Sequence, residues 1–70
     1  MKNRVKVARA EYDYTQEDLA KALGVSRQTI SHIEKGKYVP STLLALKMAH
    51  VFKRSVNDLF TLDEEETPES

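Results

Sequence analysis

Residues 24–36, GVSRQTISHIEKG, concentrate hydrogen-bonding side chains on one predicted face of a helix. Between Ser26 and Gly36 only Ile30 and Ile33 are apolar. At about 100° per residue, the apolar direction of such a helix lies between these two isoleucines. The side chains that point away from it are Gln28, Ser31, His32 and Lys35. Most of this helix therefore faces something other than a protein core.

These side chain types match the edges of DNA bases in the roughly 12 Å wide major groove. Gln28 can pair with adenine, and Arg27, at the first helical position, can pair with guanine. Ser31 and His32 can reach bases or phosphates. The alternative is an ordinary solvated surface, the better interpretation of Arg27 if no motif surrounded it. We predict base contacts by Arg27, Gln28, Ser31 and His32.

A second set of residues suits the DNA backbone. Gln16 opens the preceding helix, where free N–H groups and the helix dipole favour a phosphate, although a solvated glutamine fits equally well. Lys35, Lys37 and Tyr38 follow the polar helix, and their clustering favours contacts that position the protein without specifying sequence. The predicted phosphate contacts are Gln16, Thr29, Lys35, Lys37 and Tyr38.

Capping signals divide residues 3–60 into five short helices. The first covers residues 3–12, with Val5, Ala8 and Tyr12 on one face. The next three are capped by Thr15, Ser26 and Ser41, and the fifth, VNDLF, by Ser55. Residues 42–53, TLLALKMAHVFK, have polar side chains only every three positions after the first residue, so this fourth helix is expected to be mostly buried.

The second and third helices have the spacing of a helix-turn-helix over residues 16–36. Two helices that cross steeply need a small residue where they nearly touch, and Ala20 supplies it. Gly24 can take a positive φ in the turn. Larger aliphatic residues fill the wedge between the helices: Leu19, Leu23, Val25, Ile30 and Ile33.

The stretch TQEDLAKALGVSRQTISHIEKGKYVP, followed by LALKMAHVF and VNDLF, resembles the Cro and phage-repressor type of helix-turn-helix domain, also called Xre-like. The resemblance covers residues 3–60. It implies a compact five-helix, all-α domain of the lambda-repressor type whose third helix enters the DNA major groove. It also implies a dimer that binds operator DNA and regulates transcription. Longer members have a second domain, so the signal input of this chain stays open.

Glu34 is expected to be structural, because it lies about 40° from Ile30, beside the core, where an unpaired carboxylate is costly. The resemblance implies Arg9 of the first helix as its partner in a buried ion pair. The alternative is a general acid or base. His32 and His50 are the only histidines and are too few to indicate a metal site. We predict neither metal nor cofactor.

One small domain makes few contacts, whereas specific regulators reach dissociation constants of roughly 10⁻⁸ to 10⁻¹¹ M. We therefore expect a homodimer that reads a pseudo-palindrome with half-sites about 10 bp apart. The predicted interface residues are Val56, Leu59, Phe60 and Leu62. Strand signals are weak, but residues 1–2 and 60–62 could pair as two short strands. Such strands would lie at the dimer interface.

Composition limits the remaining function classes. The 70 residues fit one domain, without room for a large enclosed active site, and the absence of Cys fits a reducing compartment. No apolar run approaches the roughly 18 residues of a membrane span, and MKNRVKVARA is too charged for a signal peptide. A cytoplasmic protein with no membrane partner is expected.

The zero net charge hides an asymmetry. Residues 1–60 hold all 11 Lys and Arg against six Asp and Glu, an excess of five positive charges, whereas residues 61–70 hold five acids and no base. A basic body suits a polyanion, although a solvated charge run is the simpler interpretation of either part. We divide the chain into a DNA-binding domain, residues 1–62, and an acidic tail, residues 63–70.

The sequence thus predicts a DNA-binding transcriptional regulator, a repressor, with double-stranded DNA as its partner. The alternative is a protein-interaction module, such as an antitoxin or anti-regulator, in which the acidic tail or the apolar end of the fifth helix contacts another protein. An enzyme is not expected, because no Ser/His/Asp set, phosphate loop or pair of acids with a pocket can be assembled.

Overall fold

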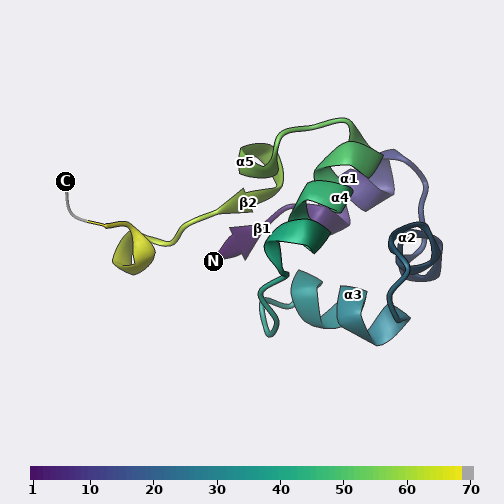
Figure 1. The fold of residues 1–70 in the computed structure, drawn as a ribbon, viewed down its shortest axis with the longest axis horizontal. Coiled ribbons are helices and arrows are strands. Elements are labelled where there is room, and N and C mark those ends of the chain that lie inside the picture. Colours follow the sequence, from purple (N-terminus) through teal and green to yellow (C-terminus); the bar gives the residue numbers. More distant parts are fainter. Residues whose placement is uncertain (69–70) are drawn as a thin grey trace.

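The computed structural model describes residues 1–68, and its described part contains five α-helices (Figure 1). They are α1 (Val5–Glu11), α2 (Gln16–Leu23), α3 (Arg27–Glu34), α4 (Thr42–Phe52) and α5 (Val56–Leu59). Two short strands, β1 (Lys2–Asn3) and β2 (Phe60–Thr61), and a 3₁₀ helix, η1 (Glu64–Glu66), complete the described elements. The five-helix prediction is confirmed.

Four helices begin at the hydroxyl residues that the sequence indicated. The side chains of Thr15, Ser26, Ser41 and Ser55 each accept a hydrogen bond from the backbone N–H three residues ahead. At α2 the box is reciprocal, because the Thr15 N–H also donates to the Asp18 carboxylate at 2.9 Å. These bonds satisfy N–H groups that a helix start leaves unpaired, so the boundaries are set locally.

Two glycines with a left-handed backbone conformation lie just after helices α2 and α3. Gly24 has φ of 73° directly after α2, and Gly36 has φ of 75° after α3. Glycine adopts this region without the steric cost of a Cβ. Only residues 24–26 separate α2 from α3, so the two helices cross at a tight turn. Figure 1 shows α3 across the lower edge of the body, with α2 beside it.

The core is apolar and is shared by all five helices. Its buried members are Val5, Ala8, Leu19, Ala20, Leu23, Ile30, Ile33, Leu44, Ala45, Met48, Ala49, Phe52, Leu59 and Phe60. The expectation of a mostly buried α4 was too broad. Leu43 is 65 % exposed and Leu46 is 55 % exposed, because the chain covers only one side of this helix.

Helix α1 is shorter than predicted, since it begins at Val5 and ends at Glu11. Val5 and Ala8 are buried, but Tyr12 follows the helix and keeps 37 % of its surface exposed. Its hydroxyl donates to the Phe52 carbonyl at 2.8 Å, and its ring contacts the Phe52 ring edge-on at 5.6 Å between centroids. Tyr12 therefore joins α1 to the end of α4 from the rim of the core.

The two strands bring the ends of the body together. They pair antiparallel, with Lys2 opposite Thr61 and Asn3 opposite Phe60, one residue later at the N-terminal end than expected. The Asn3 amide also donates to the Ile33 carbonyl at 2.8 Å. This bond ties the strand pair to the end of α3, so the ribbon supports the same helix that carries the polar face.

The described part of the acidic tail leaves the body after β2 (Figure 1). Its Asp63 carboxylate lies 2.9 Å from the Met1 amino group, and Glu66 lies 2.8 Å from the same group. Hydrogen bonds to this amine lower the pKa of both carboxyl groups and raise the pKa of the amine. Within residues 1–68, no helix is both long enough and apolar enough to cross a membrane.

Candidate nucleic-acid interface

Helix α3 has one face in the core and the other in solvent. Ile30 and Ile33 are almost completely buried, whereas Arg27, Gln28, His32 and Lys35 are exposed. Ser31 is half-buried. The solvent-facing side of α3 is thus polar, as the 3.6-residue spacing of its apolar residues predicted.

Thr29 differs from the other predicted contacts because its side chain takes part in the helix cap. Its Oγ1 lies 3.0 Å from the Ser26 hydroxyl, and its backbone N–H donates to that hydroxyl at 3.2 Å. The residue is half-buried. Thr29 therefore keeps only part of its hydrogen-bonding capacity for a ligand.

A largely buried ion pair holds α3 from behind. The Arg9 Nε lies 2.8 Å from Glu34 Oε2, and the Glu34 side chain is only 7 % exposed. Arg9 Nη1 also donates to the Tyr14 carbonyl at 2.9 Å. The guanidinium thus connects the end of α3 to α1 and to the chain before α2. Arg9 Nη2 also donates to Glu34 Oε1 at 3.4 Å, so two parallel bonds join the guanidinium and the carboxylate. Such a two-bond pair fixes the orientation of both side chains.

Sequence reasoning missed a third member of this cluster. Gln16 Nε2 donates to Glu34 Oε1 at 3.0 Å, so the first residue of α2 is fixed against the last residue of α3. From the sequence, Gln16 was predicted only to contact a DNA phosphate. Its bond to Glu34 joins residues 18 positions apart, and it depends on how the two helices cross. One Gln16 amide hydrogen remains for a ligand after this bond is formed.

The starts of α2 and α3 meet at a shallow depression with a volume of about 480 Å³. Its lining residues are Arg9, Thr15, Gln16, Glu17 and Arg27. Gln16 and Arg27, which were predicted separately to contact phosphate and base, are therefore neighbours. Free N–H groups at a helix start and a nearby guanidinium both suit an anion.

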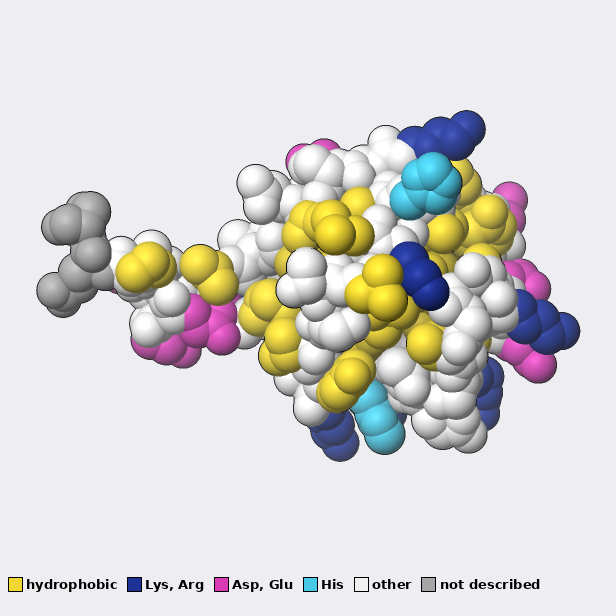
Figure 2. Space-filling model, in the orientation of Figure 1, with side chains coloured by type: hydrophobic (Ala, Val, Ile, Leu, Met, Phe, Trp, Pro, Cys, Tyr) yellow, Lys and Arg dark blue, Asp and Glu magenta, His cyan; other side chains and the backbone are white. Residues whose placement is uncertain are grey.

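The loop after α3 presents the other predicted backbone contacts. Lys35 and Lys37 are exposed, and Tyr38 keeps 47 % of its surface exposed. The Lys37 N–H donates to the His32 carbonyl at 2.9 Å, which holds the loop against the end of the helix. Figure 2 shows basic side chains over the body and a group of acidic side chains on the tail. The net positive charge of residues 1–60 thus lies on the body of the domain, and the net negative charge of the C-terminal residues lies on the tail.

The residues predicted for a dimer interface lie in different environments of the single chain. Leu59 is completely buried and Phe60 is 8 % exposed, so Leu59 belongs to the core of its own domain. The apolar pattern of α5 gave no sign of which side chain turned inward. Val56 is half-buried and Leu62 is 53 % exposed, so both have surface that another molecule can contact.

Comparisons with known proteins give a consistent result. A helix-turn-helix family model matches residues 5–59. The chain is 54 % identical over 65 residues to YgzD of Bacillus subtilis, covering 93 % of this chain and 98 % of that protein. It is 56 % identical over 66 residues to MJ0272 of Methanocaldococcus jannaschii, covering 94 % and 100 % respectively. Both relatives are named "uncharacterized HTH-type transcriptional regulator".

A solved structure supports the same assignment. The crystal structure of a "putative DNA-binding protein" from Bacteroides fragilis superposes with a TM-score of 0.75 at 34 % identity. The match covers 83 % of this chain and 94 % of that one. The capped helix pair, the family model and the relatives agree, and the chain belongs to the Cro and phage-repressor, or Xre-like, family of helix-turn-helix proteins.

Proposed function

We propose that this protein is a sequence-specific DNA-binding regulator of transcription that reads its site with α3 in the major groove. The observation that carries the proposal is the exposed polar face of α3, held from behind by the Arg9–Glu34 ion pair. A reading helix must present donors and acceptors in fixed positions, and this helix is fixed at both ends. The family relatives named as transcriptional regulators support the same function.

The proposed contacts fall into two groups. Arg27, Gln28, Ser31 and His32 contact base edges, where Gln pairs with adenine and Arg with guanine. The backbone contacts come from Gln16, Thr29, Lys35, Lys37 and Tyr38, which flank the reading face. These set the register on the duplex without specifying its sequence.

The protein is further proposed to act in the cytoplasm as a homodimeric repressor. A single module buries roughly 600–1,000 Å² on DNA, at the low end for specific recognition. A two-fold dimer doubles the number of contacts and matches a pseudo-palindromic operator with half-sites about 10 bp apart. A dimer that occupies an operator excludes other proteins from that stretch of DNA, which is the simplest form of repression.

A binding selection on random duplex DNA tests this function with the full chain. The wild type is expected to enrich one pseudo-palindromic sequence. Gln28→Ala and Arg27→Ala are each expected to cost about 1–3 kcal/mol on that sequence and to relax preference at one base position. Both side chains are exposed, so the fold should be retained.

Lys37→Ala serves as the matched control from the loop beside α3. It is expected to weaken binding to all sequences nearly equally and to reduce the salt slope by about one unit. If folded Gln28→Ala and Arg27→Ala both bound with unchanged affinity and preference, α3 would not be the reading element. The protein-interaction module, including the antitoxin class, would then be the better account.

A further inference from the structure

Asn3, in strand β1, bonds to two helices through its side-chain amide. The residue is half-buried. Its Nδ2 donates to the Ile33 carbonyl of α3 at 2.8 Å, and its Oδ1 accepts from the Val5 N–H of α1 at 3.2 Å. The second bond takes the place of a helix cap, because the side chain of Arg4 at the start of α1 makes none. Asn3 therefore joins the strand ribbon to the start of one helix and the end of another.

The Ile33 carbonyl is one of the last four carbonyls of α3, which have no partner within the helix. It accepts a bond from the Gly36 N–H at 3.0 Å as well as the bond from Asn3. Gly36 directly follows α3 and moves with it, so of these two partners only Asn3 belongs to another element. Helix carbonyls point along the axis toward the C-terminal end. The bond from Asn3 therefore resists movement of α3 along its own axis.

The ion pair between Arg9 and Glu34 holds the same end of α3 in a different direction. A side chain projects from the side of a helix, so a bond to the Glu34 carboxylate resists rotation of α3 about its axis. Ile33 and Glu34 are consecutive residues, so the two attachments lie side by side in the chain. One bond along the axis and one ion pair across it together fix both the position and the rotation of α3. Asn3 supplies the first of the two.

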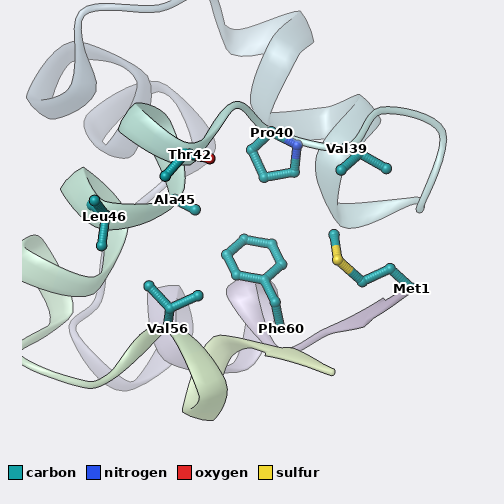
Figure 3. A pocket seen from close by; sticks show the side chains of 8 residues that line it. All are labelled: Met1, Val39, Pro40, Thr42, Ala45, Leu46, Val56 and Phe60. Carbon is teal, nitrogen blue, oxygen red and sulfur yellow. The ribbon is translucent and has the colours of Figure 1, made fainter. Parts of the chain in front are cut away.

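The backbone that carries Asn3 is held by buried residues. Asn3 lies opposite Phe60 in the strand pair, and the neighbouring Arg4 N–H donates to the Leu59 carbonyl at 2.8 Å. Leu59 is completely buried and Phe60 is 8 % exposed. Figure 3 shows the Phe60 ring turned toward α4, α5 and the connection before α4, whose side chains line an apolar groove together with it. Asn3 therefore stands on a packed base, which a residue that positions another element requires.

We propose that Asn3 is a positioning residue for DNA reading, which sets the place of α3 along its axis through the Ile33 carbonyl. This role rests on the proposed function, because the place of α3 affects specificity only if α3 reads bases. Groups that recognise a ligand must be held within roughly 0.5 Å and 10–20° of their productive geometry. A shift of α3 moves all of its reading side chains at once. Loss of the bond from Asn3 should therefore weaken preference at every base position that α3 reads.

Two substitutions in the full-length chain remove the bond to α3 and keep the bond to α1. Asn3→Asp has the same shape and still accepts from the Val5 N–H, but a carboxylate cannot donate to the Ile33 carbonyl. Asn3→Ser is neutral, and its hydroxyl can accept from the N–H two residues ahead but is too short to reach Ile33. Asn57→Asp is the matched control, because Asn57 is the other asparagine of the chain and is exposed in α5. Circular dichroism and thermal unfolding check that each variant is folded at the temperature of the binding measurements.

The decisive measurement is the ratio of affinity for the selected operator to affinity for random duplex. This ratio should fall about 10-fold or more for both Asn3 variants and stay unchanged for Asn57→Asp. Single-base variants of the operator then show where preference is lost. Gln28→Ala should relax one base position, whereas Asn3→Ser should relax all the positions that α3 reads. A residue that only stabilised the fold would lower the unfolding temperature and leave the ratio of the folded protein unchanged.

The outcomes separate this role of Asn3 from the proposed function. A wild type without sequence preference would defeat the proposed function. Wild-type preference with an unchanged ratio in folded Asn3→Ser would defeat only the positioning role. A ratio that fell in Asn3→Asp alone would also defeat it, because the added charge would then be the cause. Loss confined to one base position would make Asn3 a local contact, and failure of both Asn3 variants to fold would make it a purely structural residue, so either result would overturn the inference.

Discussion

Two clusters in this molecule each pair a cationic nitrogen with carboxylate oxygens, but they differ in how far they are buried. Under α3, Arg9 and Glu34 pair at 2.8 Å with side chains that are 16 % and 7 % exposed, and Gln16 donates to the same carboxylate. On the acidic tail, the Met1 amine pairs with Asp63 and Glu66 at 2.9 and 2.8 Å, and these three side chains are 21 %, 28 % and 37 % exposed. The distances are nearly equal, so distance alone does not distinguish their importance.

Burial does distinguish them. Removing one partner from a buried pair leaves a charge that water cannot solvate, whereas an exposed charge is solvated at once and screened by salt. The cluster under α3 therefore fixes the orientation of α3 against α1 and α2. The cluster on the tail holds η1 to the N-terminus at the surface. Substitutions in the two clusters should consequently differ in size and in salt dependence.

The largest expected effect is on the buried pair. Arg9→Met leaves Glu34 without its charged partner and should lower the free energy of unfolding by about 3–5 kcal/mol. The double variant Arg9→Met/Glu34→Leu should recover most of this loss, because two apolar side chains can replace a buried pair at little cost. Urea unfolding measures both. A loss below about 1 kcal/mol for Arg9→Met would place this pair among ordinary surface ion pairs.

The two clusters also differ in how far the sequence could reveal them. The Arg9–Glu34 pair was implied by family resemblance, and the caps at Thr15, Ser26, Ser41 and Ser55 follow from neighbouring residues. Local hydrogen bonds of this kind depend on few other parts of the chain. Most helix boundaries and the helix-turn-helix were predictable for that reason.

The remaining features depend on how distant segments pack. The bond from Gln16 to Glu34 requires the crossing of α2 and α3, and the contacts of Met1 require the strand register. The polar period of α4 indicated a narrow exposed stripe, but Leu46 is exposed because no element covers it. Apolar residues such as Leu59 and Leu62 look alike in sequence. Only the fold places one in the core and the other at the surface.

A smaller effect is expected from removing the acidic tail. Deleting residues 63–70 takes away five acids but no buried side chain of η1, so the body should stay folded. Non-specific DNA binding should tighten, because the remaining chain has an excess of positive charge. Titration of random duplex at several salt concentrations measures this. Affinity should fall with a log–log slope of about −0.9 per phosphate contact in both forms.

A charge control identifies the cause of any tightening. Replacing the tail acids with Gln and Asn keeps the length of the chain and should tighten non-specific binding as the deletion does. If only the deletion had an effect, the tail would act through its bulk. Association that did not change with salt, in any of the three forms, would argue against a phosphate-binding body and for a protein partner.

The smallest expected effect is the pH dependence of the exposed cluster. Folding lowers the pKa of the Asp63 and Glu66 carboxyl groups because they accept hydrogen bonds from the Met1 amine. Their contribution to stability should be present above the ordinary carboxyl range, near pH 4, and should be lost as the pH falls through the lowered values. The same contacts raise the pKa of the amine. Its contribution is present below its ordinary value, near pH 8, and is lost as the pH rises through the raised value.

The paired variant Asp63→Asn/Glu66→Gln should therefore differ from the wild type most between about pH 5 and pH 8 and converge with it at both extremes. Thermal unfolding across this range measures the difference, with Glu64→Gln/Glu65→Gln as a control that removes the same charge from the same turn. High salt should reduce the effect, because this cluster is more exposed to solvent than the Arg9–Glu34 pair. A difference between the wild type and the paired variant that persisted unchanged at pH 3 and in high salt would mean that the tail cluster behaves like the buried one, and the distinction between the two environments would fail.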